Sequence, residues 1–179
     1  MKTVINEKQL NKIIERLAFE IIEKEHDNFS NLAIIGIKRR GDIIGKRIKD
    51  IIKNKEGVDL LFGALDITFY RDDFSRKFVH PSVEGSEIPF DVEDKEIILV
   101  DDVVHTGRTI RAAIEAIFSF GRPKKIKVLA IIDRIGEREI PCFVEYKGRQ
   151  IQVEKNISIE VHLKEIDKDE GVFYGKTLS

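Results

Sequence analysis

The sequence lacks several features that would point to particular classes of protein. Cys142 is the single cysteine among 179 residues, so an internal disulfide is impossible and a reducing environment is expected. No run of 18 or more apolar residues occurs, which disfavours a membrane span. The opening residues, MKTVINEKQL, lack the long apolar core of a secretion signal. We therefore expect a cytoplasmic protein in which Cys142 is a small buried apolar residue.

An excess of charge of either sign is also missing. The formal net charge is −1, so a nucleic-acid partner would have to be bound by a local basic patch. Apolar residues make up 42% of the chain and charged residues 35%, which is ordinary for a globular protein. The length suits one domain with a real core, and there is no internal repeat or low-complexity linker.

The spacing of apolar residues alternates between helical and strand patterns. Asn6 and Gln9 form a capping box ahead of a helix whose apolar positions recur from Leu10 to Ile22. Strands are expected at residues 32–37, 60–68, 96–100 and 126–132, helices at 42–53 and 108–120, a long mobile loop or hairpin at 70–92, and short strands in the last quarter. This order predicts an α/β fold with a central parallel sheet covered by helices on both faces.

Three loops follow the predicted strands and contain unusual residues: GIKRRG, DDVVHTGRT and DRIGERE. In parallel sheets, ligands bind beyond the carboxyl ends of the strands. Residues 106–109, TGRT, lie where a strand turns into a helix. Gly107 allows the backbone to point successive N–H groups inward, and the helix N-terminus adds partial positive charge. This predicts a phosphate site, although the four residues alone would also suit a plain capping turn.

Asp101 and Asp102 stand directly before this turn. Carboxylates repel a phosphate, so their function must be different. They can accept hydrogen bonds from two neighbouring hydroxyls or help to hold a cation. A sugar phosphate with vicinal hydroxyls satisfies the aspartates and the turn together. The alternative is a pair of solvated acids that cap a strand.

The segment IILVDDVVHTGRT resembles the phosphoribosyl-pyrophosphate (PRPP) signature of the type I phosphoribosyltransferases. Over almost the whole chain, GIKRRG, LDITFYRDD, FGRPKKI and DRIGEREIP are similar to the pyrimidine operon attenuator family, PyrR, whose members also have uracil phosphoribosyltransferase activity. The resemblance implies one domain over residues 1–179, with a flexible lid at about 70–90. It also implies a small hood formed by the N-terminal helix region and by residues from about 140 to 179.

The resemblance assigns the nucleotide site by position. Asp101 and Asp102 would bind the ribose hydroxyls, and residues 103–109 would hold the 5-phosphate, chiefly through backbone N–H groups and the hydroxyls of Thr106 and Thr109. The whole implied set is Lys38, Arg39, Arg40, Asp101, Asp102, Val103, Val104, His105, Thr106, Gly107, Arg108 and Thr109.

The loop at Lys38, Arg39 and Arg40 would bind pyrophosphate, through a tight turn with a non-proline cis peptide as in related enzymes. Departure of pyrophosphate builds negative charge, which Arg39, Arg40, Arg71 at the lid base and a Mg²⁺ ion carried mainly by PRPP would neutralise. No residue is a certain metal ligand. A closing lid, from Arg71 to about Gly85, would keep water from the sugar cation.

The uracil would lie against Arg134, with backbone groups near Ile159 and Glu160 in the hood reading its edge. Some positions depart from the family. Arg39 stands where many relatives have threonine, and His105 occupies an often aromatic position, where we expect it to line the loop. DRIGERE is one residue longer than the DRGHRE form and lacks its histidine, which leaves any role of that histidine unsupported.

The family resemblance implies two functions: conversion of uracil and PRPP to UMP and pyrophosphate, and UMP-dependent binding of pyrimidine operon leader RNA. Residues 122–149 hold eight basic and four acidic residues, an excess that would suit an RNA patch. The alternatives are a uracil enzyme without RNA regulation and a hypoxanthine or guanine enzyme. Phe19 is expected on the outer face of the first helix, where a second subunit suits it better than RNA, in a homodimer or higher homo-oligomer.

Overall fold

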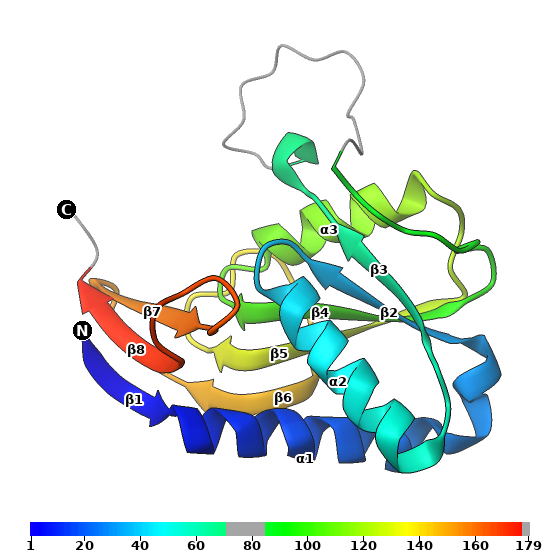
Figure 1. Ribbon diagram of the computed structural model, residues 1–179. Helices are drawn as coiled ribbons and strands as arrows, with labels where there is room; N and C mark the ends of the chain where they lie inside the picture. Colours follow the sequence, from blue (N-terminus) through cyan, green and yellow to red (C-terminus); the bar gives the residue numbers. More distant parts are fainter. Residues whose placement is uncertain (71–84, 177–179) are drawn as a thin grey trace.

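A five-stranded parallel sheet forms the centre of the computed structural model, which describes residues 1–70 and 85–176 (Figure 1). Its strand order is β3-β2-β4-β5-β6. The strands are β2 (Leu32–Ile37), β3 (Leu61–Leu65), β4 (Glu96–Val104), β5 (Lys125–Arg134) and β6 (Val144–Ile151). The helices are α1 (Glu7–Glu25), α2 (Gly41–Glu56) and α3 (Arg108–Phe118), with 3-10 turns at His26–Asn31 and Thr68–Tyr70.

Successive residues of the strands face opposite sides, and each side has its own core. Ile34 and Ile98 pack with residues of α1 and α2, whereas their neighbours Ile35 and Leu99 pack with Ile117 and other residues of α3. All six residues of β2 are buried, as expected for a strand covered on both faces. The predicted α/β architecture is therefore confirmed. Among the described residues, no helix combines the length and apolar character needed to cross a membrane.

A smaller antiparallel sheet lies at one end, beside the carboxyl end of the central sheet (Figure 1). It contains β1 (Lys2–Asn6), β8 (Gly171–Lys176) and β7 (Ile157–His162), in that order, and we call this sheet with the 163–170 segment the hood. Asn6 ends β1 and begins α1: its side chain accepts a hydrogen bond from Gln9 N, and the Gln9 side chain accepts one from Asn6 N. The expected capping box is confirmed.

Two parts of the hood expectation are wrong. Residues 144–151 pair with β5 in the central sheet, because Val144 and Tyr146 lie in register with Val128 and Leu129 and are buried. Helix α1 packs mainly against α2 and β6 and also contacts β8, but of the N-terminal region only the preceding strand β1 joins the hood sheet. Most of the expected lid, including Arg71, lies outside the described residues.

Several element boundaries also differ from expectation. α2 and β5 are longer than expected at both ends, as Gly41–Glu56 and Lys125–Arg134. β4 does not end before Asp101 but continues to Val104, because Asp101 and Val103 remain in register with Ala130 and Ile132 of β5. β3 ends at Leu65 rather than at residue 68, and the next residue, Asp66, accepts a hydrogen bond from Thr68 N that begins a 3-10 turn. α3 ends at Phe118, two residues early.

A buried ion cluster joins the end of α1 to the central sheet. Lys127 Nζ lies 2.6 Å from Glu25 Oε1 and 2.9 Å from Glu96 Oε2. Tyr146 donates its hydroxyl hydrogen to Glu25 as well. Lys127 and Glu25 are 7% and 5% exposed, so neither charge has water to replace a lost partner.

We predict that Lys127→Ala lowers the free energy of unfolding by about 3–5 kcal/mol, because it leaves the Glu25 carboxylate buried without its cation. Urea unfolding would measure the loss. Lys125→Ala is the matched control, since Lys125 lies on the same strand with its side chain exposed, and it should change stability by less than about 0.5 kcal/mol. Equal effects of the two changes would show that the cluster contributes nothing special.

Candidate active site

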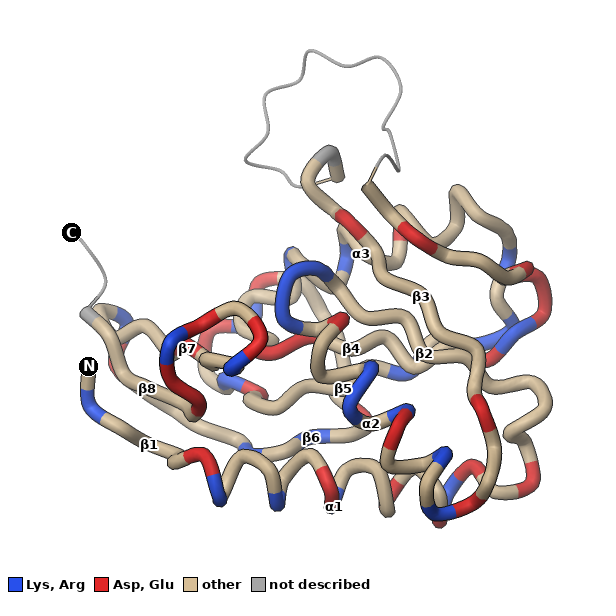
Figure 2. Tube along the Cα trace, viewed as in Figure 1, with Lys and Arg blue, Asp and Glu red and all other residues tan. Residues whose placement is uncertain are grey.

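The strand order reverses at β2 and β4, which is where parallel sheets of this kind form ligand sites. Here the loops that follow the two strands meet around a pocket of about 250 Å³. It is lined by Ile37, Lys38, Arg39, Arg40, Asp66, Ile67, Thr68, Asp101, Asp102, Val103 and Thr109. Figure 2 shows the basic β2–α2 loop close to acidic residues of the central sheet. The structure thus brings the predicted KRR and DD residues together with Val103 and with Thr109 of the TGRT turn. The other predicted residues of this segment do not line the pocket: Val104, His105, Thr106, Gly107 and Arg108.

Asp101 and Asp102 differ in environment. Asp101 is 7% exposed and accepts a hydrogen bond from Asp102 N at 2.9 Å. Asp102 is half-buried and accepts one from Val103 N at 2.8 Å. Burial raises the pKa of Asp102, and the Val103 N–H and the charge of Arg40 counteract this rise. A ligand that donates hydrogen bonds, or a cation, would stabilise the ionised Asp102 further.

The turn before α3 requires glycine at position 107. Gly107 has a φ of +89°, and an added Cβ would lie 2.4 Å from the carbonyl oxygen of Ile140. The backbone of Thr106 fixes this packing, because its carbonyl oxygen accepts hydrogen bonds from the N–H groups of Glu139 and Ile140, both at 2.9 Å. Arg108 Nε donates to Glu139 at 2.6 Å. The DRIGERE loop therefore supports the TGRT turn from behind.

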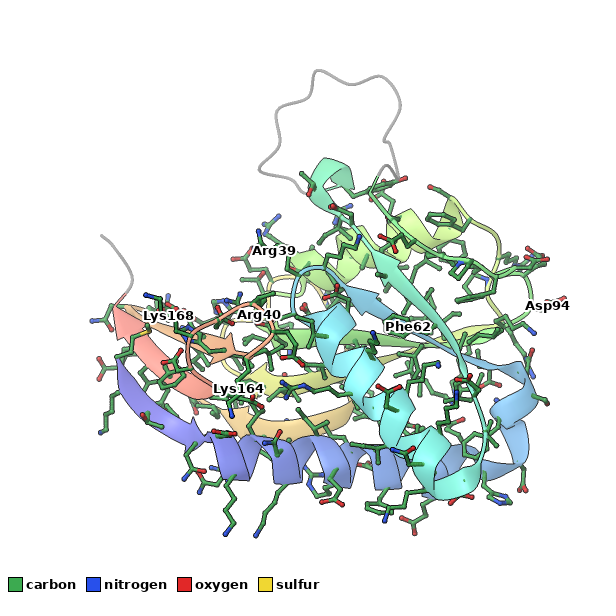
Figure 3. The ribbon with its side chains drawn as sticks, in the orientation of Figure 1. Arg39, Arg40, Phe62, Asp94, Lys164 and Lys168 are labelled. Carbon is green, nitrogen blue, oxygen red and sulfur yellow. The ribbon has the colours of Figure 1, made fainter. Side chains whose placement is uncertain are left out.

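The three basic residues after β2 have different partners. The peptide bond between Lys38 and Arg39 is cis, as expected. Lys38 Nζ donates to the carbonyl oxygen of Gly85 at 2.6 Å and lies 3.2 Å from Glu87. Arg39 is exposed at the top of the loop (Figure 3), and within residues 1–70 and 85–176 its side chain has no hydrogen-bond partner. Of the three, Arg39 is the most available to a ligand.

Arg40 instead joins the β2–α2 loop to the hood. Its guanidinium donates two hydrogen bonds to the Asp167 carboxylate, from Nη2 at 2.9 Å and from Nε at 3.3 Å. Burial alone would raise the pKa of Asp167. The hydrogen bonds from Arg40 and from the Leu163 N–H outweigh burial, and the pKa is lowered. Asp167 was not among the residues expected from sequence, because no motif marks it and it lies 127 positions from Arg40.

The residues expected at the base side come from two elements. Arg134 is the last residue of β5 and is buried, with its guanidinium donating to the carbonyl oxygen of Ile157 at 2.8 Å. Ile159 and Glu160 lie on β7, which contacts β4. None of the three lines the 250 Å³ pocket. Their role against a base remains a prediction.

Asp66 and Thr68 are further lining residues that sequence reasoning missed. Thr68 donates its hydroxyl hydrogen to Asp66 Oδ1 at 2.6 Å, and this bond lowers the pKa of Asp66. Asp66 N donates to the hydroxyl of Ser86 at 2.9 Å. The sequence feature that could have identified them is an aspartate directly after a buried strand, followed two residues later by a threonine. This pattern is typical of a turn closed by a side-chain hydrogen bond.

The eight basic residues of 122–149 do not gather in one patch. Lys127 is buried in the ion cluster, and Arg138 is paired with Asp133 at 2.6 Å. Arg122 precedes β5 and Arg134 ends it, and the ten residues of this strand span about 30 Å, so the two charges lie at opposite ends of the sheet. Proximity in sequence overstated proximity in space.

Residues 2–165 match the model of the phosphoribosyl transferase domain. The bifunctional protein PyrR of Caldicellulosiruptor saccharolyticus is 44% identical over 96% of this chain and 93% of that protein. PyrR of Clostridium acetobutylicum is 45% identical over 94% of both. The chain belongs to the PyrR family of phosphoribosyltransferases.

Solved structures of this domain family share the fold. The hypoxanthine phosphoribosyltransferase of Trypanosoma cruzi superposes with a TM-score of 0.74 over 99% of this chain and 98% of its own, at 14% identity. A Bacillus anthracis hypoxanthine-guanine enzyme gives 0.62 at 22% identity, over 84% of this chain and 82% of its own. At such identities the likeness shows the fold alone, and the PyrR relatives decide the branch of the family.

We predict that Gly107→Ala weakens binding of ribose 5-phosphate at least about tenfold, since the added methyl would push the turn off Ile140. Gly57→Ala is the matched control: Gly57 also has positive φ, at +71°, but an added Cβ there meets nothing within 4 Å. The control should cost about 1 kcal/mol of stability and leave binding unchanged. Calorimetric titration of both variants would separate steric disruption of the turn from backbone strain alone.

Proposed function

We propose that this protein converts uracil and PRPP to UMP and pyrophosphate and, with UMP bound, binds a pyrimidine operon leader RNA to attenuate transcription. The observation that supports the enzyme is the meeting of Asp101-Asp102, Thr109 of the TGRT turn and the KRR loop around one pocket. The observation that supports the regulator is 41–45% identity, over nearly the whole chain, to relatives named bifunctional PyrR. A cytoplasmic location follows from such a function.

The residues divide the substrate between them. The N–H groups of residues 103–109 and the hydroxyls of Thr106 and Thr109 would hold the 5-phosphate at the N-terminus of α3. Asp101 and Asp102 would accept hydrogen bonds from the ribose hydroxyls. The exposed guanidinium of Arg39 would neutralise pyrophosphate, with Arg40 behind it and Arg71 contributing from the lid.

A Mg²⁺ ion fits this donor set. Asp101 and Asp102 offer hard carboxylate oxygens at the pocket, the ligand type that Mg²⁺ prefers. The described residues contain no cluster of three acidic, histidine or cysteine side chains that would form a metal site of their own. An ion that arrives with PRPP therefore suits the site better than a resident one. When bound, it would neutralise charge on the leaving pyrophosphate.

The deciding experiment supplies purified protein with PRPP, Mg²⁺ and each of uracil, hypoxanthine and guanine. We expect UMP and pyrophosphate from uracil and no product from the purines. Turnover of a purine but not of uracil would place the chain in the purine branch instead. Titration of a pyrimidine leader RNA with and without UMP then tests the regulator, and no UMP-dependent binding would leave a uracil enzyme alone.

Two substitutions test the assignment of the PRPP site. Asp102→Asn removes a carboxylate that would accept hydrogen bonds from ribose, and Thr109→Val removes a phosphate donor while it preserves the side-chain shape. We expect each to raise the KM for PRPP about tenfold or more, since a charged hydrogen bond contributes about 1.5–3 kcal/mol. Thermal unfolding checks that both fold. If both keep wild-type kinetics, the DDVVHTGRT loop is only a structural turn.

The exposed phenylalanine on α1 is the basis for predicting a homo-oligomer. Phe19 is 42% exposed on this helix, with Lys55 Nζ 5.3 Å from its ring centroid. A second copy would bury the ring, whereas Glu15 and Glu23 beside it would repel RNA. We expect Phe19→Glu to shift the protein to smaller species in size-exclusion chromatography with light scattering, with uracil turnover retained. Unchanged mass together with lost RNA affinity would assign Phe19 to an RNA face.

A further inference from the structure

One carboxylate in the DRIGERE loop joins two parts of the site. Glu137 Oε2 lies 2.8 Å from His105 Nε2 and 2.5 Å from Arg134 Nη2. An ionised carboxylate only accepts hydrogen bonds, so His105 donates from Nε2. His105 belongs to the 103–109 loop that follows β4, and Arg134 ends β5. The contact with His105, and then the charge of Arg134, lowers the pKa of Glu137.

Arg134 extends this connection to the hood. Its Nη1 donates to the carbonyl oxygen of Ile157 at 2.8 Å, and its Nη2 donates to that of Glu154 at 3.4 Å. Ile157 begins β7, the strand that also holds Ile159 and Glu160. The Arg134 side chain is only 6% exposed, so its charge cannot turn into water when a partner moves. A shift of the Glu137 carboxylate would therefore displace Arg134 and, through its hydrogen bond to Ile157, the start of β7.

The other contacts of the DRIGERE loop lead elsewhere. Arg138 donates to His105 O at 2.6 Å and to Asp133, which returns to β5. Glu139 pairs with Arg108 at the surface of the same turn. Among the side-chain hydrogen bonds and ion pairs of the described residues, those of Glu137 and Arg134 connect the 103–109 segment to β7.

We propose that Glu137 is a positioning residue that couples occupation of the 103–109 loop by a sugar phosphate to the setting of β7 against the base. This inference rests on the proposed function, which gives those two elements their ligands. A phosphate that fixes the loop also fixes His105. Through Glu137 and Arg134 it would then fix the carbonyl of Ile157, and PRPP would prepare the hood for uracil.

The coupling predicts a split in the kinetic constants. Glu137→Gln preserves the shape of the side chain but removes the charge that binds both His105 and Arg134. His105→Phe cuts the same connection at the loop and leaves the Glu137–Arg134 pair intact. With PRPP saturating, we expect each variant to raise the KM for uracil about tenfold. For Glu137→Gln, which lies outside the 103–109 segment, the KM for PRPP should change by less than about twofold. The KM of the double variant for uracil should equal that of either single variant, because both substitutions interrupt the same connection.

Glu115→Gln is the matched control. It removes the same charge from an ion pair, that with Arg111 at 3.0 Å, on the exposed face of α3. It should leave both constants unchanged. Multiplying effects of the two substitutions, near a hundredfold in the double variant, would mean that His105 and Glu137 act separately, and the proposal would fail. Equal rises in both KM values would likewise show a general disturbance of the site.

A measurement without turnover separates this inference from the proposed function. Ribose 5-phosphate fills the loop but supplies no base. We expect it to increase hydrogen-exchange protection of the β7 amides at residues 157–162 in the wild type, and to leave them unchanged in Glu137→Gln. Absence of the effect in a wild type that consumes uracil would overturn the coupling alone. A wild type that shows the effect but does not use uracil would overturn the proposed function alone.

Discussion

The candidate site depends on a backbone contact between β2, α2 and β4 that only glycine permits. A Cβ on Gly41 would lie 2.2 Å from the carbonyl oxygen of Val100, and one on Gly36 would lie 2.3 Å from Cα of Asp42. These distances are shorter than any contact a side chain could make, so the start of α2 rests directly on β4 at Val100, just before the Asp101-Asp102 pair. Because of this approach, the KRR loop and the Asp101-Asp102 pair share one pocket rather than lining separate faces.

The regular architecture was predictable because the buried strands are marked by runs of consecutive apolar residues. β2 was predicted with its observed bounds, since six consecutive apolar residues are flanked by polar ones. The end of β4 was not, because the sequence after Val100 turns polar while the pairing with β5 continues. Where β4 continues into charged residues, its hydrogen bonds to β5 keep it extended. A pattern of nearby residues does not show which strand will pair with it. The same reason hid the membership of β6 in the central sheet.

The chemistry of the site was predictable in part for a related reason. Acids, glycine and hydroxyls at a strand end are local, so the DDVVHTGRT loop was evident from sequence. The partners that set these residues are distant. Arg40 meets Asp167 and Arg47 meets Glu165 and Glu170, so two arginines near the start of α2 are tied to the hood. The sequence predicted Arg40 as a ligand of pyrophosphate, and the structure pairs its guanidinium with Asp167, so a pyrophosphate would have to share Arg40 with this carboxylate.

That partnership favours Arg39 over Arg40 as the ligand that we propose for the leaving pyrophosphate. A cation already bound twice by a carboxylate gains little from a second anion, because part of its charge is neutralised. Arg39 has no such partner among the described residues and lies exposed beside the pocket. A threonine at this position would leave Arg40 and Lys38 to meet the pyrophosphate, and both are engaged by acids here. The guanidinium of Arg39 therefore supplies positive charge that no carboxylate of the described residues neutralises. The charges of Arg40 and Lys38 are already partly neutralised, by Asp167 in the hood and by Glu87.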